Sequence, residues 1–456
     1  MELFKDLKRM LQSEQISANE TILYEHSFDE SSHPSILPNI VIFPYDVSDI
    51  QKVVSYANDR SVPLTPYGIG SGLEGQAIPV KQGISLDFQH MNKVLEVRPE
   101  DLLVKVQPGV TREELNQTLK KYGLFFPIDP GANATIGGMV STNASGTTAV
   151  RYGAMRQQIV DLEVVLADGR KIRTGSLASK SSSGYNLTNL FAGSEGTLGI
   201  FTEIILKVYG IPETVSSVRS CFPSVKDCGQ AAVALLTSGV SITRIELVDE
   251  RSIREMNKFH NTTYEELPTL FIEITGNEAG VNYDTAFTKD ILEDLNCSAV
   301  LIETDSKKRG VLWKARHELS YAFRHKPNCS TIGTDVCVPL SSLPTIIEKT
   351  RKKIDSLGLD GAIFGHVGDG NFHTLILFDP NSPTETEKAE IINEAIVSWA
   401  LSYGGTCTGE HGVGLGKQKF QKKEHGESLE IMMGIKCMLD PNNIMNPGKI
   451  FPELEK

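Results

Sequence analysis

Three glycine-rich segments constrain the fold of this chain more than any other feature. They are Gly70–Gly75 (GSGLEG), Pro130–Gly146 (PGANATIGGMVSTNASG) and Gly193–Gly199 (GSEGTLG). Glycine lets a backbone approach a ligand closely, and successive N–H groups can surround a phosphate. Each segment alone could be a tight surface turn. Because all three occur within one run of alternating strands and helices, we interpret them as loops that line a long, flat ligand bearing phosphate.

The first segment also fits the G-x-G-x-x-G pattern of dinucleotide-binding proteins. That pattern indicates a dinucleotide site only where it opens a helix. Here Pro79 and Gly83 follow, where the helix would have to run. The sequence therefore disfavours a nicotinamide-type Rossmann site and favours a free-standing loop.

The length and charge of the chain limit its domains and partners. Its 456 residues exceed what one hydrophobic core usually holds, so we expect about two to three domains. A net charge of −12 would repel a phosphate backbone, and we exclude nucleic acid as a partner. An anionic small substrate would then need a local cationic patch or a metal ion.

The cysteines and the apolar segments bear on the compartment. The seven cysteines are scattered and form no C-x-x-C pair, which disfavours disulfides, a zinc ribbon and an iron–sulfur cluster. Neither a signal peptide nor a transmembrane segment is recognisable. We expect a cytoplasmic protein, and peripheral contact of the amphipathic N-terminal segment with a membrane is the alternative.

Hydrophobic patterning predicts a helical N-terminal segment (1–37) and two domains (38–213 and 214–456). In the first domain, Asp46 caps a helix, Thr111 and Glu114 form a capping box, and Asp168-Gly169 turns a hairpin. In the second, strands at 244–248, 269–274, 299–303, 334–338, 362–365 and 372–378 alternate with helices at 224–238, 280–295, 311–325, 341–356 and 384–403. The fold class is α+β, and the second domain is expected to be a sandwich of helices on a mostly antiparallel sheet.

Two histidines, His366 and His373, flank the turn Asp369-Gly370 between two apolar strands, and Glu410-His411 follows in a second glycine-bracketed segment. A hairpin would bring the two imidazoles together at one end. Two histidines and a carboxylate with an open position form the ligand set of a catalytic divalent metal. An isolated histidine pair is more often a hydrogen-bonded turn, and this alternative stays open.

The motifs together resemble the flavin domain of the vanillyl-alcohol oxidase/p-cresol methylhydroxylase superfamily. The segments that carry the resemblance are 66–75 (PYGIGSGLEG), 134–138 (ATIGG), 151–153 (RYG) and 193–200 (GSEGTLGI). Within the superfamily, the chain is similar to the branch of D-lactate dehydrogenases and glycolate-oxidase flavin subunits, essentially over residues 38–451. The resemblance implies a p-cresol methylhydroxylase-type FAD-binding domain followed by a substrate domain.

The resemblance also implies which residues bind FAD. It places pyrophosphate against the first and second segments and adenine near the third. The implied residues are Pro66, Gly68, Gly70, Ser71, Gly72, Leu73, Pro130, Gly137, Gly138, Ser141, Thr142, Gly146, Glu195, Gly196, Ile200 and Asn446. Relatives that bond flavin covalently often use a histidine in the first loop. None occurs between Tyr67 and Gly75, so FAD is expected to be noncovalent.

For the second domain, the resemblance implies a zinc or manganese ion bound by His366, His373 and Glu410, with His411 as catalytic base. The family's W-x-x-R pattern appears as Trp313–Arg316, which implies that Arg316 binds a substrate carboxylate, with Ser320 on the same helix face. A solvated helix-surface charge is the alternative for Arg316.

Substrate and acceptor follow from the same resemblance. Gly333 stands where relatives acting on D-2-hydroxyglutarate carry a lysine, which favours a small D-2-hydroxy acid, D-lactate first. Electrons would leave through a quinone, a cytochrome or another electron-transfer protein, and a homodimer is compatible with the family. A glycolate-oxidase flavin subunit and a non-catalytic flavin-binding scaffold are the rival functions.

The family resemblance assigns no role to a basic run near the C-terminus. It comprises Lys417, Lys419, Lys422 and Lys423. We expect a solvated helix face, and docking of an electron acceptor or a membrane surface is the alternative.

Overall fold

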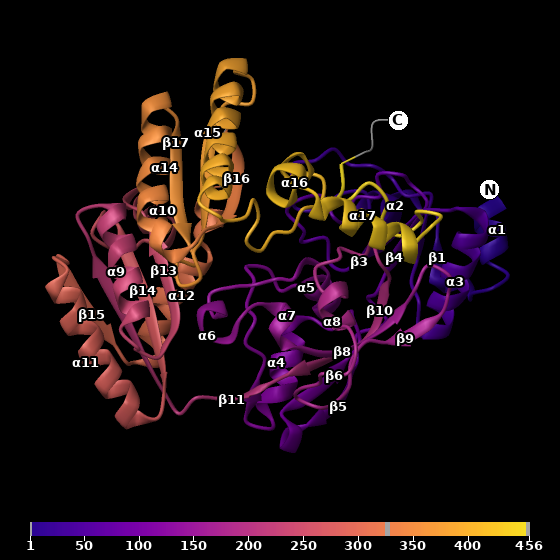
Figure 1. Ribbon diagram of the computed structural model, residues 1–456, viewed down its shortest axis with the longest axis horizontal. Coiled ribbons are helices and arrows are strands. Elements are labelled where there is room, and N and C mark those ends of the chain that lie inside the picture. The colour runs from indigo at the N-terminus through magenta and orange to yellow at the C-terminus, as the bar shows by residue number, and fades with distance from the viewer. Residues whose placement is uncertain (1, 324–328, 453–456) are drawn as a thin grey trace. The chain divides into compact units, whose positions relative to one another are not determined.

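In the computed structural model, residues 2–323 and 329–452 are described, apart from the side chains of residues 320 and 321, and they belong to two compact units (Figure 1). The first unit comprises Met1–Ser145, Gly153–Ile211 and Glu410–Lys456, and the second comprises Gly146–Tyr152 and Pro212–Gly409. The chain therefore leaves the first unit twice and returns to it.

The C-terminal segment 410–456 belongs to the first unit, whereas the sequence analysis grouped it with the second domain. Backbone pairing explains this difference. The Leu64 N–H donates to Ile444 O at 2.7 Å, the Asn446 N–H donates to Leu64 O at 2.7 Å, and the Leu415 N–H donates to Glu74 O at 2.7 Å. Such pairing is not encoded in local periodicity, so the return of the chain could not be read from sequence.

Two main sheets build the first unit. One has the order β1-β2-β4-β3, with β2, β3 and β4 parallel and β1 antiparallel. The other is antiparallel, with the order β5-β6-β10-β8-β9. A third pair joins β7 and β11. Their bounds are β1 (Ile16–Ser17), β2 (Ile40–Ile42), β3 (Leu64–Tyr67), β4 (Ile84–Asp87), β5 (Val94–Arg98), β6 (Leu103–Val106), β7 (Leu124–Phe125), β8 (Ile159–Val165), β9 (Lys171–Arg173), β10 (Ile200–Lys207) and β11 (Tyr209–Gly210).

Side-chain hydrogen bonds mark where two helices of this unit begin. The side chain of Asp46 accepts from the Asp49 N–H, and Thr111 and Glu114 form the predicted capping box. The predicted hairpin joins β8 to β9, with Val165 opposite Lys171. The helices are α1 (Glu2–Leu7), α2 (Glu20–Glu25), α3 (Val47–Arg60), α4 (Arg112–Lys120), α5 (Ile136–Thr142), α7 (Met155–Gln158), α8 (Leu187–Phe191), α16 (Gln418–His425) and α17 (Ser428–Leu439).

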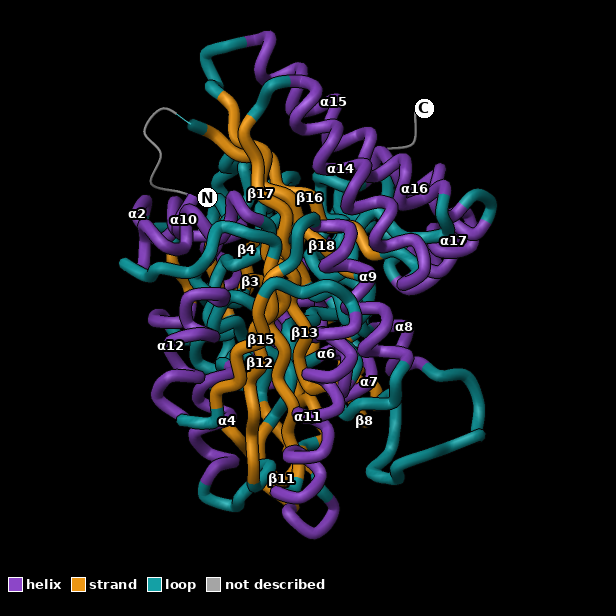
Figure 2. Tube along the Cα trace, turned by 90° about the vertical axis from the view of Figure 1, so that its left-hand side faces the viewer, coloured by secondary structure: helices purple, strands orange, loops and turns teal. Residues whose placement is uncertain are grey.

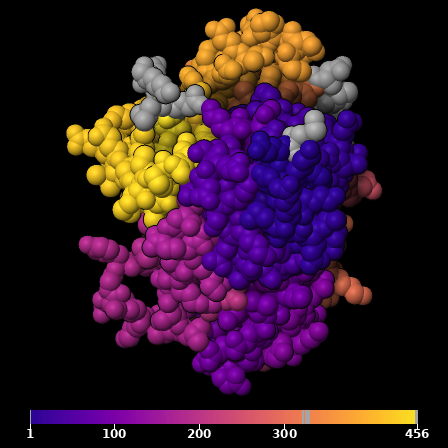
Figure 3. Space-filling view, turned by 90° about the vertical axis from the view of Figure 1, so that its right-hand side faces the viewer, coloured from indigo at the N-terminus to yellow at the C-terminus, as the bar shows by residue number. Residues whose placement is uncertain are grey.

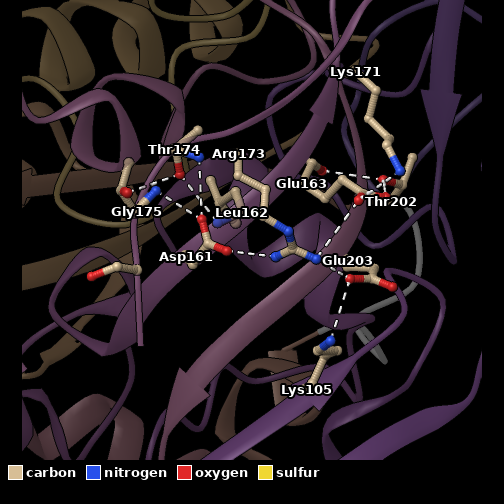
Figure 4. A network of polar contacts seen from close by, with 12 residues as sticks. Lys105, Asp161, Leu162, Glu163, Lys171, Arg173, Thr174, Gly175, Thr202 and Glu203 are labelled. Carbon is tan, nitrogen blue, oxygen red and sulfur yellow. Dashed lines mark hydrogen bonds and ion pairs between the residues drawn. The ribbon is translucent and has the colours of Figure 1, made fainter. Parts of the chain in front are cut away.

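The five-stranded sheet carries a network of charges (Figure 4). Arg173 on β9 contacts the carboxylates of Asp161 and Glu203, and Lys105 lies 3.7 Å from Glu203. Beside the network lies a cavity of about 280 Å³ lined by Arg98, Lys105, Asp161 and Arg173, among others. Cations and carboxylates alternate, so the charges neutralise one another across β6, β8, β9 and β10.

A long exposed loop leads from β9 to α8. Residues 175–187 all lie exposed, and Tyr185 retains 97% of its accessible surface. The loop is the broad teal excursion beside α8 in Figure 2 and the magenta arm in Figure 3. It contributes nothing to the apolar core of the unit.

The second unit is built on a seven-stranded sheet with the order β15-β12-β14-β13-β17-β18-β16. All the pairings that the structure describes in it are antiparallel. This agrees with the predicted α+β class. The bounds are β12 (Thr214–Cys221), β13 (Ile242–Val248), β14 (Thr269–Gly276), β15 (Ala299–Glu303), β16 (Ser330–Cys337), β17 (Asp360–Gly365) and β18 (Asn371–Phe378). The sequence analysis missed β12.

Helices cover this sheet, as α9, α11 and α14 show beside it in Figure 1. A buried cluster joins α10, α12 and α13 to the strand residues Phe271, Phe364 and Leu377. The helices are α6 (Ala149–Tyr152), α9 (Val225–Thr237), α10 (Glu250–His260), α11 (Glu278–Asp294), α12 (Ser306–His317), α13 (Leu319–Phe323), α14 (Leu343–Leu357) and α15 (Pro383–Ser402). Helix α10 was not predicted, and the predicted helix 311–325 is divided into α12 and α13.

Candidate active site

The three glycine-rich segments come together within the first unit. A Cβ atom at Gly68 would lie 2.5 Å from Thr135 Oγ1, and one at Gly196 would collide with the ring of Pro66. The Glu195 N–H donates to Ser141 O at 2.8 Å. The residues directly before the first segment, Pro66 and Gly68, therefore touch the other two segments, and these close approaches disfavour side chains at positions 68 and 196.

The middle segment is not a loop throughout. Residues 136–142 form helix α5, and Thr135 caps it by accepting from the Gly138 N–H at 3.3 Å. The hydroxyls of Ser141 and Thr142 donate to the carbonyls of Gly137 and Gly138 one turn back. The small residues misled the sequence analysis here, because glycine and threonine are weak helix formers.

The residues expected to bind FAD lie mostly in the first unit. These are Pro66, Gly68, Gly70, Ser71, Gly72, Leu73, Pro130, Gly137, Gly138, Ser141, Thr142, Glu195, Gly196, Ile200 and Asn446. Gly146 begins the short segment 146–152 of the second unit. The side chain of Ile200 packs in the apolar core around β2 and β4, so that side chain stabilises the fold.

Asn446 joins the C-terminal segment to the third glycine segment and to Gln76, the residue that follows the first. Its side chain is 1% exposed, and its Nδ2 donates to Gln76 O at 3.0 Å and to Glu195 O at 2.8 Å. Next to it, Lys449 Nζ donates to Ile78 O and to Asn446 Oδ1. Burial lowers the pKa of Lys449 to about 8, although Glu195 and Asp29 act in the opposite direction.

The carboxylate of Glu195 holds the chain around His411. Its two oxygens accept from the N–H groups of Val413 at 2.6 Å and Gly414 at 2.9 Å. Gln76 Nε2 donates to the carbonyl of His411 at 2.7 Å. Burial raises the pKa of Glu195 to about 7, against the lowering effect of the two N–H donors and Lys449. The backbone that carries His411 is thus anchored by Gln76, which directly follows the first glycine segment, and by Glu195 of the third.

In the second unit, the predicted histidine hairpin forms between β17 and β18, where Phe364 is opposite His373. The ring centroids of His366 and His373 lie 5.5 Å apart. His373 Nδ1 is 3.5 Å from Asp335 Oδ1, and His366 Nδ1 is 2.7 Å from Glu246 Oε1. Each imidazole therefore has its Nδ1 against a fully buried carboxylate.

The sequence analysis gave neither carboxylate a role. Asp335 accepts from Asn371 Nδ2 and from Thr408 Oγ1, each at 2.8 Å, and its carbonyl accepts from the Gly409 N–H at 3.2 Å. It thereby joins the histidine hairpin to the end of the second unit, directly before Glu410 and His411 in sequence. The sequence feature that could have revealed Asp335 is an acidic residue within an otherwise apolar strand.

Arg316 on α12 is 6% exposed, which excludes the alternative of a solvated surface charge. Its Nη2 donates to Glu246 Oε2 at 2.5 Å, and its guanidinium lies 5.2 Å from the centre of the Phe364 ring. Burial would raise the pKa of Glu246, but His366 and Arg316 hold it below its usual value. The side chain of Ser320, the third predicted catalytic residue, lies outside the described residues.

The basic run differs from its predicted form. Lys417 is 4% exposed and lies 3.4 Å from Glu74, so it is a buried ion-pair partner. Lys422 on α16 is exposed and pairs with Glu430 at 3.5 Å. The run is therefore not one solvated cationic face. Within residues 2–323 and 329–452, no helix is both long and apolar enough to cross a membrane.

Comparison with known protein families identifies both parts of the chain. A family model described as "FAD binding domain" matches residues 38–175, and one described as "FAD linked oxidases, C-terminal domain" matches residues 211–450. Among solved structures, p-cresol methylhydroxylase with substrate bound has a TM-score of 0.80 at 18% identity, over 100% of this chain and 97% of that one. This likeness shows the fold alone, and it confirms the predicted FAD-binding architecture.

Individual relatives are more similar in sequence. A probable mitochondrial D-lactate dehydrogenase of Danio rerio is 43% identical over 96% of this chain and 89% of its own length. The mitochondrial D-lactate dehydrogenase (cytochrome) of Arabidopsis thaliana is 42% identical, with coverage of 99% and 80%. The glycolate oxidase subunit GlcD of Bacillus subtilis is 33% identical, with coverage of 93% and 92%.

These relatives correct one expectation. The names of the Danio rerio and Arabidopsis thaliana proteins place them in mitochondria, and this contradicts the predicted cytoplasmic location. The sequence argument considered only an apolar secretory signal and a membrane span. Neither criterion reports on mitochondria, whose targeting segments are amphipathic.

Proposed function

Because the chain belongs to the family of FAD-linked oxidases, we propose that it oxidises D-lactate to the corresponding 2-oxo acid. The observation that carries this proposal is 43% identity to the probable D-lactate dehydrogenase of Danio rerio over 96% of the chain. The reaction removes the hydroxyl proton and the hydride on C2, so it needs a base, a hydride acceptor and groups that hold the carboxylate.

FAD would be held by the glycine segments of the first unit. Their residues fit a dinucleotide, because the glycines allow backbone N–H groups to approach a phosphate and the second and third segments lie in contact through Ser141 and Glu195. When bound, FAD supplies the hydride acceptor of the reaction. The lack of a histidine between Tyr67 and Gly75 supports noncovalent binding, and release of intact flavin by acid precipitation would test it.

A divalent zinc or manganese ion would be held by His366, His373 and Glu410. The chemistry of the donor set supports this, because His366 Nδ1 is hydrogen-bonded to the buried carboxylate of Glu246, and His373 Nδ1 lies 3.5 Å from that of Asp335. Metal-binding histidines in proteins commonly have such a partner on the second ring nitrogen. The ion would supply positive charge at the substrate hydroxyl and so lower its pKa.

Arg316 would bind the carboxylate of the substrate. A guanidinium matches a carboxylate with two parallel N–H donors. Its Nη2 is taken by Glu246, whereas its Nε is buried without a hydrogen-bond partner among the described residues. A buried donor of this kind is costly unless a ligand satisfies it, which supports a role for Arg316 in binding an anion. Ser320 would share this role.

His411 would remove the hydroxyl proton. Its backbone is anchored through Gln76 and Glu195, which restricts where the imidazole can go. An imidazole positioned beside the reacting hydroxyl is suited to proton transfer. Electrons would then pass to an external acceptor. A cytochrome is favoured over a quinone because the name of the Arabidopsis thaliana relative includes one.

A second candidate is the flavin subunit of a glycolate oxidase, favoured by the 33% identity to GlcD of Bacillus subtilis. Anaerobic mixing of the purified protein with D-lactate, L-lactate, glycolate and D-2-hydroxyglutarate separates the two candidates. D-lactate should bleach the flavin fastest. Faster bleaching by glycolate would establish the second candidate, and no bleaching by any hydroxy acid would leave only a flavin-binding scaffold.

A further inference from the structure

One buried carboxylate in the second unit touches two groups of the proposed site. Glu246 lies on the central strand β13 and has 0% exposure. Its Oε1 is 2.7 Å from His366 Nδ1, and its Oε2 accepts from Arg316 Nη2 at 2.5 Å. The two partners come from different elements, the turn after β17 and helix α12.

The contact with His366 decides which nitrogen of the imidazole carries hydrogen. A carboxylate that faces an arginine is ionised, and an ionised carboxylate can only accept hydrogen bonds. His366 must therefore carry its hydrogen on Nδ1 when neutral. Its Nε2 is then the atom with a lone pair, which is the state that a metal ion requires.

The contact with Arg316 sets the direction of the guanidinium. Phe364 covers one face of the Arg316 guanidinium, with its ring centre 5.2 Å away, and Glu246 binds one of its terminal nitrogens. The remaining N–H groups of the guanidinium therefore point in a restricted direction. Arg316 would otherwise lose rotational freedom when it binds an anion, and this arrangement reduces that loss.

We propose that Glu246 is a positioning residue that sets the metal-binding tautomer of His366 and aims Arg316 at the substrate carboxylate. This inference rests on the proposed function, because it assigns His366 to the metal and Arg316 to the substrate. It adds that the two are coupled: a change at one carboxylate alters metal affinity and substrate binding together. A structural ion pair would instead change stability alone.

The Glu246→Gln variant separates these roles. A glutamine amide that accepts from Arg316 through its oxygen presents an NH₂ group to His366 Nδ1. That contact favours the tautomer with hydrogen on Nε2, which cannot bind a metal through that atom. The matched control is Glu273→Gln on the adjacent strand β14, another buried carboxylate, which lies 3.5 Å from Arg244.

Three measurements on the purified flavoprotein test the proposal. Equilibrium dialysis with Mn²⁺ should show a Kd raised about 10- to 100-fold in Glu246→Gln. The KM for D-lactate, measured at saturating Mn²⁺, should also rise. The ¹⁵N shifts of the His366 ring in metal-free protein should show the change of tautomer. Glu273→Gln should match wild type in all three.

The outcomes are distinct. If wild type binds no Mn²⁺ or other divalent ion, the metal part of the proposed function fails. If wild type binds Mn²⁺ and Glu246→Gln has the same Kd, KM and His366 tautomer, Glu246 is only a structural residue and the inference is overturned. Should Glu246→Gln not fold, Glu246→Asp replaces it. Its shorter side chain cannot reach both partners, so wild-type values for both Kd and KM in that variant would equally overturn the inference.

Discussion

Glu195 Oε2 accepts a hydrogen bond from the backbone N–H of Gly414 at 2.9 Å, which joins the third glycine segment to the chain that carries His411. The same carboxylate accepts from Val413, and Lys449 acts on it electrostatically. One buried acidic group thus anchors the proposed catalytic base, and its own protonation is perturbed by burial. Stability and catalysis should both depend on it.

The first prediction concerns pH. The unfolded chain ionises this carboxyl near the ordinary pKa of 4.5, whereas burial raises the pKa of Glu195 to about 7 in the folded protein. Between these values the folded state binds the proton more tightly, so the free energy of unfolding should fall as pH rises through this window. Glu195→Gln should flatten that part of a Tm-against-pH curve. The exposed control Glu213→Gln should retain it, and an unchanged slope in Glu195→Gln would contradict the prediction.

The second prediction concerns His411. Replacement by asparagine should slow flavin reduction by D-lactate by about 10²–10⁴, the usual contribution of a positioned base. FAD should stay bound, because the anchoring contacts of this segment use its backbone. Anaerobic stopped-flow measures the rate. The loss should shrink at high pH, where hydroxide partly replaces the imidazole. A wild-type rate would remove His411 from the mechanism, and loss of bound metal would make it a ligand instead.

The third prediction concerns the metal. Chelation should stop the reduction of flavin by D-lactate while FAD remains bound, and His366→Ala should behave like chelated wild type. The reason is that each protein ligand contributes directly to metal binding, so the loss of one of three should strongly weaken the affinity. Elemental analysis and flavin absorbance measure the two effects. Full activity in a preparation free of divalent metal would show that the histidine hairpin serves the fold alone.

Part of this structure was predictable because it depends on residues close in sequence. The Asp46 cap, the capping box at Thr111 and the histidine hairpin each involve partners within a few positions. The alternation of apolar residues likewise predicted six of the strands in the antiparallel sheet of the second unit.

The rest depends on partners that are distant in sequence. Glu246 is one of 57 acidic residues, and only the contacts with Arg316 and His366, 70 and 120 positions away, distinguish it. The burial of Lys417 likewise follows from Glu74. Periodicity carries no information about such pairs, so the candidate site could be predicted only as far as its motifs resembled a family.

The fourth prediction concerns substrate selectivity. Gly333 on β16 is exposed, and a Cβ added there would meet Leu375 at 3.9 Å, an ordinary contact. Gly333→Lys should therefore fold and raise kcat/KM for D-2-hydroxyglutarate relative to D-lactate. An exposed ion pair contributes about 0.2–1 kcal/mol, so the gain should be up to about fivefold. Gly333→Met supplies similar bulk without charge and should show no gain. Equal effects of the two variants would show that position 333 does not face the second carboxylate.

The fifth prediction concerns the anchor of the C-terminal segment. Lys436 on α17 is buried and donates to Thr197 O and Met445 O, each at 2.8 Å, and to the carboxylate of Asp440. Asp440 in turn accepts from the Ile444 and Met445 N–H groups. Lys436→Met would leave the buried carboxylate of Asp440 and two buried carbonyls without their cationic donor. Breaking such a buried pair typically lowers the free energy of unfolding by about 3–5 kcal/mol.

The matched control for this anchor is Lys422→Met on the neighbouring helix α16, where the ion pair with Glu430 is exposed on both sides. An exposed pair of this kind should change the free energy of unfolding by less than about 1 kcal/mol. Urea unfolding of both variants, followed by flavin fluorescence and circular dichroism, measures the difference. Because Thr197 belongs to the third glycine segment, Lys436→Met should also release FAD at lower urea than wild type. Equal midpoints for the two variants would mean that the buried lysine does not anchor the returning segment.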